Sequence, residues 1–191
     1  VQRVLRSGAG PAPRGLLKSV LLARTDDATG ALDCHEGTVN GAGSALDWLA
    51  GREGLPLSQL LDAGQSTAAN GAEPPLFLNG IGGLGSPFWR SDFESRFVGT
   101  GTTGTRLLAV LESIAFLLYT NYRELAAHGP AFTRLLLTGG LSANDYLCQC
   151  LADLSGTLVA RSDEPEATAR GLARLMAADD ARDWPVPATS M

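Results

Sequence analysis

The residues best suited to chemistry gather in one short run, Thr138-Gly139-Gly140 followed by Ser142 and Asn144. Two adjacent glycines let a backbone turn sharply and approach a ligand closely, because neither carries a Cβ. Ser142 or Asn144 then offers a side-chain oxygen that can cap the start of a helix. A helix N-terminus presents free N–H groups and positive potential to an anion. The run therefore predicts an anion-binding turn, although an ordinary structural turn would use the same residues.

The elements on either side of this turn follow from hydrophobic spacing. The apolar run Leu135-Leu136-Leu137 predicts a buried strand before it, and Leu158-Val159-Ala160 predicts a second short strand. Between them, apolar residues recur at helical spacing at Tyr146, Leu147, Cys150, Leu151 and Leu154. Gly156 is placed to end that helix in the left-handed conformation. The order strand, turn, helix, strand is typical of an α/β domain.

The chain before this unit predicts a hairpin and several helices. Two β-like segments, 16–23 and 31–38, flank an Asp- and Gly-bearing turn. A helix then starts at Gly41-Ala42-Gly43 and contains Asp47, and its small residues allow close approach either to another element or to a phosphate. Further on, we expect a short helix at 57–62, strands at 76–78 and 97–99, a long helix at 106–127 with Thr105 as its N-cap, and a last helix from Glu166.

Read as a whole, the glycine run resembles a known family. The pattern T-G-G-x-S-x-N, with a glutamine and an A-D pair at helical spacing behind it, resembles the C-terminal half of the FGGY carbohydrate kinases, the glycerol kinase- and xylulokinase-like proteins. The matching residues are Gly139, Gly140, Ser142, Asn144, Gln149, Ala152 and Asp153. The runs 83–89, 111–116 and 166–173 resemble the same family, and the resemblance covers residues 15–177.

The resemblance implies a fold, an activity and a set of binding residues. The fold is α/β, an actin-like ATPase (ribonuclease H-like) domain with a mixed sheet flanked by helices, at residues 15–178. An irregular lead-in, 1–14, and a loose tail, 179–191, lie outside it. The implied activity is transfer of the ATP γ-phosphate to a sugar or polyol hydroxyl. Gly139 and Gly140 would then contact the phosphates, Asn144 the adenine side, and Gly43 and Asp47 would line the same cleft. Asp47 departs from the family, which often carries glutamine there.

The resemblance also implies what this chain lacks. In the family the catalytic aspartate, the Mg²⁺-binding loop and most sugar contacts come from an N-terminal domain, so we expect neither a catalytic residue nor metal ligands here. Because the chain starts at Val1 without an initiator Met, we expect a piece of a longer protein, inactive alone, whose partner is its own N-terminal kinase domain. A homodimer is left open.

One loop supports a competing hypothesis. Arg90, Glu94 and Ser95 stand where the relatives carry an aspartate and an arginine-glycine pair. These departures could be compensatory, with Arg90 and Glu94 exchanging partners. They would equally suit a degenerate, non-catalytic actin-like domain that binds a nucleotide or a protein partner without turnover.

Composition excludes several other classes. With 191 residues, 45% hydrophobic and 18% charged, the chain has the make-up of a globular protein. Its net charge of −5 argues against a nucleic-acid surface, and no apolar run is long enough for a membrane span. Cys34, Cys148 and Cys150 lack metal-ligand spacing and suit reduced thiols, so we expect a cytoplasmic protein. A P-loop and a Rossmann dinucleotide fingerprint are both missing.

Overall fold

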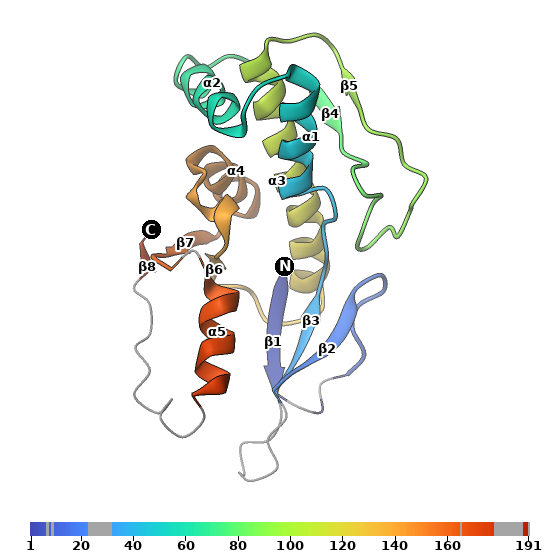
Figure 1. Cartoon of the computed structure of the whole chain (residues 1–191). Helices are drawn as coiled ribbons and strands as arrows, with labels where there is room; N and C mark the ends of the chain where they lie inside the picture. Colours follow the sequence, from blue (N-terminus) through green and yellow to red (C-terminus); the bar gives the residue numbers. More distant parts are fainter. Residues whose placement is uncertain (7, 9, 23–31, 165, 178–188, 191) are drawn as a thin grey trace. The chain divides into compact units, whose positions relative to one another are not determined.

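The fold comes from a computed structural model that describes residues 1–6, 8, 10–22, 32–164, 166–177 and 189–190. The chain divides into two compact units, Val1–Ala131 and Phe132–Met191. Each unit is described below by itself, and the elements are labelled in Figure 1.

The predicted hairpin supplies two strands of the three-stranded sheet in the first unit, and the second of them is the central strand of that sheet. Strands β2 (Leu17–Leu22) and β3 (Leu32–Glu36) pair antiparallel, as expected. The turn between them lies outside the described residues. A further strand, β1 (Gln2–Arg6), pairs antiparallel with the other edge of β3, giving the order β1-β3-β2. The prediction of an irregular lead-in over 1–14 is therefore wrong at its start, because backbone pairing with β3 holds residues 2–6 in a strand.

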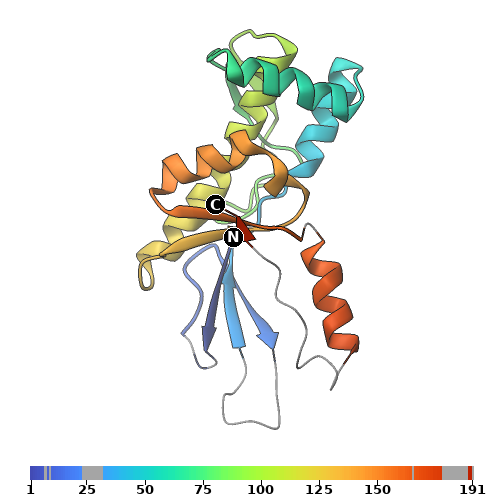
Figure 2. The same cartoon turned by 90° about the vertical axis from the view of Figure 1, so that its left-hand side faces the viewer.

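Three helices follow the sheet in the first unit. Helix α1 (Gly43–Glu53) starts where the small residues predicted it. Helix α2 (Leu57–Ala69) is longer than the expected 57–62. Helix α3 (Thr103–Ala127) is the longest, and Thr102, rather than Thr105, is its N-cap, accepting a hydrogen bond from the Thr105 backbone N–H. Figures 1 and 2 show α3 running from the three-stranded sheet to α1 and α2.

The crossing of α2 and α3 is close because glycines lie at the contact. A Cβ on Gly64 of α2 would collide with the Leu107 side chain of α3. A Cβ on Gly104 of α3 would collide with Thr67 Oγ1 and lie 2.7 Å from the Ala63 carbonyl oxygen of α2. Both helices therefore need glycine at these positions to reach this separation.

A two-stranded sheet and an aromatic cluster complete the first unit. Strands β4 (Leu76–Leu78) and β5 (Arg96–Val98) pair antiparallel. Phe77 and Phe97 stand opposite each other with ring centroids 4.7 Å apart, and Trp48 of α1 lies 5.3 Å from Phe77. The guanidinium of Arg106 lies 5.8 Å from the Phe97 centroid. This cluster attaches the small sheet to α1 and α3.

The second unit contains the predicted strand–turn–helix–strand order. Strand β6 (Arg134–Leu137) and strand β7 (Leu158–Ser162) pair parallel, and β8 (Thr189–Ser190) adds antiparallel to β7, so this sheet is mixed, as predicted. Between β6 and β7 lie the 3₁₀ turn η1 (Gly140–Ala143) and helix α4 (Asp145–Ser155). Gly156 ends α4 in the left-handed conformation, with φ 58°. Most of the predicted tail, 179–191, lies outside the described residues.

One burial prediction in the second unit is wrong. Strand β6 was expected to be buried, but Leu136 is 54% exposed. Helix α5 (Ala167–Met176) forms where the last helix was predicted, and none of its residues is buried.

Candidate functional site

The Gly139-Gly140 turn is held by its own hydrogen bonds. Gly139 has φ 88°, a backbone conformation that favours glycine. Its carbonyl oxygen accepts two bonds from Ser142, one from the backbone N–H at 3.0 Å and one from the hydroxyl at 2.7 Å. Gly140 follows as the first residue of η1 and is exposed. The turn therefore has a fixed shape and an accessible backbone.

Two residues, Ser142 and Asn144, were predicted as candidates for the N-cap of α4, and Asn144 is the one that caps it. Its Oδ1 accepts a hydrogen bond from the Leu147 backbone N–H at 2.9 Å. The predicted contact with adenine can use the amide nitrogen or the second lone pair of the oxygen. Asn144 consequently has a structural role whether or not it also touches a ligand.

A charged pair lies beside this cap. Asp145 is in the first turn of α4, and its Oδ1 lies 2.6 Å from Arg161 Nη1 of β7. A carboxylate at this helix end would repel an anion, and the guanidinium offsets that charge. The ion pair raises the pKa of Arg161. Close by, burial raises the pKa of the Cys148 thiol, which donates to the Ser142 carbonyl at 3.4 Å.

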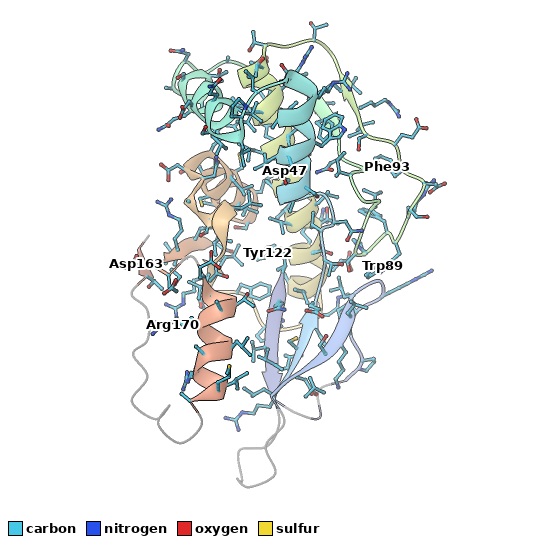
Figure 3. The ribbon with its side chains drawn as sticks, viewed as in Figure 1. Asp47, Trp89, Phe93, Tyr122, Asp163 and Arg170 are labelled. Carbon is cyan, nitrogen blue, oxygen red and sulfur yellow. The ribbon has the colours of Figure 1, made fainter. Side chains whose placement is uncertain are left out.

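The second group of predicted site residues lies in the first unit, at the start of α1. Gly43 is the first residue of this helix and is exposed. Asp47 comes one turn later, is also exposed, and is labelled on α1 in Figure 3. Residues four apart share one face of a helix, so Gly43 and Asp47 lie on the same exposed face. Helix α1 has no side-chain N-cap.

Gly43 and Gly140 both have open surroundings. Both are helical residues without positive φ, so backbone conformation does not require glycine at either position. A Cβ built on either one meets no described atom within 4 Å. Gly51 of α1 and Gly171 of α5 share these properties, so open space by itself does not mark a binding site. Helix α1 packs through Ala45, Leu46, Leu49 and Ala50, and Gly43 is not at such a contact.

The tryptophan at the end of the loop from Gly83 to Trp89 attaches this loop to the chain at Gly15. The indole Nε1 of Trp89 donates to the Gly15 carbonyl at 2.7 Å, and Trp89 has φ 50° (Figure 3). The neighbouring Arg90 forms two hydrogen bonds of 3.1 Å with Asp92.

Ser95, another departure in this loop, accepts a 3.0 Å bond from the Gly80 backbone N–H. Together with the Arg90–Asp92 pair, this contact shows that two of the unusual loop residues have partners within the loop itself.

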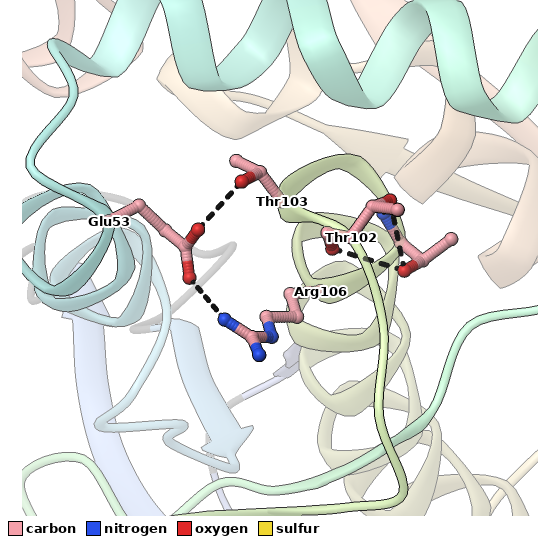
Figure 4. A network of polar contacts seen from close by, with 5 residues as sticks. Glu53, Thr102, Thr103 and Arg106 are labelled. Carbon is pink, nitrogen blue, oxygen red and sulfur yellow. Dashed lines mark hydrogen bonds and ion pairs between the residues drawn. The ribbon is translucent and has the colours of Figure 1, made fainter.

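Two buried polar residues were missed by sequence reasoning. Glu53, whose side chain is 11% exposed, ends α1 and accepts hydrogen bonds from Thr103 Oγ1 at 2.6 Å and Arg106 Nη1 at 2.8 Å (Figure 4). Asn79, 5% exposed, follows β4 and donates hydrogen bonds to Gly41, earlier in the chain, and to Ser113, later in the chain. The capacity of both side chains to pair with distant residues is visible only in the structure.

The described residues do not offer the donors of a metal centre. No group of three His, Cys, Asp or Glu side chains in this part of the chain is arranged to hold a metal ion. Among the described helices, none has the length and apolar character needed to cross a bilayer.

The fold and the turn together define the class of protein. A mixed sheet with a strand–glycine turn–helix unit, joined to an antiparallel sheet and a long helix, is the actin-like ATPase fold of the structures it resembles. The chain belongs to the FGGY family of carbohydrate kinases and matches the model of its C-terminal domain over residues 18–179.

Relatives of this chain are named glycerol kinases, and this chain matches part of the length of each. The glycerol kinase of Leptothrix cholodnii is 39% identical over 150 residues, which are 73% of this chain and 30% of the relative. That of Nitrobacter hamburgensis is 33% identical over 183 residues, covering 90% and 35%. This chain thus spans about a third of the length of these two relatives.

Solved structures agree on the fold. Plasmodium falciparum glycerol kinase with ADP has a TM-score of 0.69 and 25% identity, covering 84% of this chain and 32% of that one. Ligand-bound xylulose kinase from Lactobacillus acidophilus has a TM-score of 0.68 and 20% identity, covering 100% and 39%.

Proposed function

We propose that this chain is the nucleotide-binding half of a kinase that transfers the γ-phosphate of ATP to a hydroxyl group of a sugar or polyol. The observation that carries the proposal is the match to the C-terminal domain of the FGGY carbohydrate kinases over residues 18–179, together with the accessible backbone of the Gly139-Gly140 turn before α4. A phosphate chain is a group that needs such close access to backbone N–H donors.

Each predicted residue then has a task in binding. Gly139 and Gly140 bring backbone N–H groups to the phosphates, and the start of α1 at Gly43 adds a second positive helix end. Asn144 offers its amide nitrogen to the adenine side while its oxygen caps α4. Asp47, on the face of α1 that carries Gly43, is assigned to nucleotide binding on the family resemblance. ATP, when bound, supplies the phosphoryl group, and this half of the protein positions and neutralises it.

The remaining machinery is proposed to lie in another domain of the same protein. A kinase needs a general base, an acceptor pocket and ligands for Mg²⁺. This chain spans about a third of the length of its glycerol kinase relatives, and the partner that we propose for it is the N-terminal kinase domain. Because relatives 33–39% identical are named glycerol kinases, a polyol such as glycerol is the first acceptor to test.

Calorimetry with ADP on the full-length protein tests the nucleotide site. Gly140→Val should weaken ADP binding at least ten-fold, about 1.4 kcal/mol, because the new side chain occupies the approach to the backbone. Ala143→Val, on the same turn and also exposed, is the matched control and should bind ADP like the wild type. Thermal melts check that both variants fold.

A coupled assay with ATP and either glycerol or xylulose tests the reaction. We expect turnover with the full-length protein and none with residues 1–191 alone. Unchanged ADP affinity in Gly140→Val would refute the placement of the site. ADP binding without turnover on any sugar or polyol would instead support the non-catalytic alternative.

A further inference from the structure

A buried asparagine connects three segments of the first unit. Asn79 directly follows β4 and is 5% exposed. Its Nδ2 donates to the Gly41 carbonyl oxygen at 2.7 Å and to Ser113 Oγ of α3 at 3.1 Å. Its Oδ1 accepts from the Ile81 backbone N–H at 3.3 Å. Both hydrogens of the amide nitrogen and one lone pair of the oxygen are thus used.

This arrangement holds the side chain of Asn79 in one orientation. Ser113 Oγ, which accepts from Asn79, itself donates to the Val110 carbonyl at 2.6 Å. A buried polar network in which every member is paired is rigid, since any rotation leaves a group without a partner. Asn79 is therefore anchored to the middle of α3, a helix whose neighbouring residues Val110 and Ile114 are fully buried.

The segment that Asn79 holds is the β3–α1 loop, residues 38–42. A Cβ on Gly41 would collide with Asn79 Oδ1, so the loop backbone lies directly against this side chain. Gly41 precedes the first residue of α1, Gly43, by two positions. The position of the Gly41 carbonyl therefore constrains where the N–H groups at the start of α1 point.

Other hydrogen bonds attach the same loop to the glycine-rich loop, residues 80–89. Asn40 Nδ2 donates to the Gly82 carbonyl, and the Ser86 N–H donates to the Thr38 carbonyl, both at 3.0 Å. These bonds join two loops to each other. Asn79 adds the attachment to α3, which neither of them provides.

We propose that Asn79 is a positioning residue for nucleotide binding. It fixes the β3–α1 loop against α3 and so sets the direction of the backbone N–H groups at Gly43. The inference rests on the proposed function, in which the start of α1 faces the phosphates. Binding groups must be held to within about 0.5 Å of their productive geometry, and supporting hydrogen bonds of this kind provide that precision.

The variants that test the role of Asn79 differ in which of its bonds they remove. Asn79→Ala and Asn79→Leu both remove the donor to Gly41, one with and one without loss of volume. Ile114→Val is the matched control, because it removes buried volume from the same part of α3 and leaves every hydrogen bond of Asn79 in place. All are made in the full-length protein, and thermal melts rank their stability.

Two measurements separate positioning from general stability. The first is calorimetry with ADP and with adenosine, which lacks the phosphates. Both Asn79 variants should lose about ten-fold in ADP affinity relative to adenosine, about 1.4 kcal/mol, whereas Ile114→Val should keep the wild-type ratio. The second is amide hydrogen exchange at residues 41–45, which should be faster in the Asn79 variants only.

Each outcome has a distinct meaning. If the wild type binds ADP but the ratio is unchanged in both Asn79 variants, or if Ile114→Val changes it equally, the positioning role is refuted and the proposed function stands. If the wild type does not bind ADP, the proposed function fails, and the nucleotide role of Asn79 fails with it. Exchange at 41–45 that is unaltered in the Asn79 variants would refute the positioning of the loop in either case.

Discussion

Replacing Glu53 by glutamine should destabilise the first unit through one identifiable contact. Glu53 joins the end of α1 to the first turn of α3 by accepting hydrogen bonds from Thr103 and Arg106 (Figure 4). Glutamine keeps one oxygen but turns an NH₂ group toward the other donor. A hydrogen bond to a charged group contributes roughly 1.5–3 kcal/mol. Because the Arg106 side chain is 37% exposed and partly screened by water, we expect a loss near the lower end of that range.

The pH dependence of this loss follows from the carboxylate. The hydrogen bond from Thr103, followed by that from Arg106, lowers the pKa of Glu53 below its ordinary value of 4.5. A group whose pKa is lower in the folded state stabilises the fold above its unfolded-state pKa and loses that effect as the pH falls through its folded-state pKa. The difference between wild type and Glu53→Gln should therefore be constant near neutral pH and shrink as the pH falls below 4.5.

Urea unfolding of wild type, Glu53→Gln, Arg106→Met and the double variant measures the coupling directly. Methionine keeps an unbranched apolar stem beside Phe97 and removes the charge. Asp62→Asn, an exposed acid on α2, controls for the loss of one negative charge and should change stability by no more than about 0.5 kcal/mol. A coupling energy within the ~0.3–0.5 kcal/mol scatter of independent sites would refute the reasoning, as would a Glu53→Gln effect that persists unchanged at low pH.

Two further predictions concern packing and capping. Gly104→Ala should lower stability by about 1–3 kcal/mol, because the new Cβ meets Thr67 and the Ala63 carbonyl. Gly51→Ala, in an open position of α1, should raise it by up to about 1 kcal/mol in the same thermal melts, and equal effects would contradict the close crossing. Asn144→Ala should cost about 1 kcal/mol by removing the α4 cap. Gln149→Ala, which loses only an exposed bond to Asp153, should cost less, and the reverse order would argue against the cap.

Much of the fold could be predicted because its signals are local. The hairpin, the two parallel strands around the glycine turn and the glycine end of α4 each depend on residues a few positions apart. Strand β1 was missed because Gly8, Gly10 and two nearby prolines indicate irregular chain, whereas its pairing with β3 spans about thirty residues. Helix α2 was predicted too short, although Gly64 is compatible with a helix that crosses another closely.

The candidate site was predictable in its glycines and not in its supports. Gly139, Gly140 and Asn144 lie in one short run of the chain, so their pattern can be recognised in the sequence. Asn79 and Glu53 are single polar residues without a motif, and their partners lie 34 to 53 positions away. Long-range hydrogen bonds of this kind carry no local sequence signal, which is why the supporting residues appear only once the elements are placed.

The close crossing of α2 and α3 also has an evolutionary consequence. Gly64 faces Leu107, and Gly104 faces Thr67, so each glycine shares its space with one side chain on the other helix. A larger residue at position 104 becomes acceptable when position 67 shrinks, and the same holds for positions 64 and 107. Substitutions at these two pairs should therefore arise together in descendants of this sequence, each half of a pair being harmful until the other has changed.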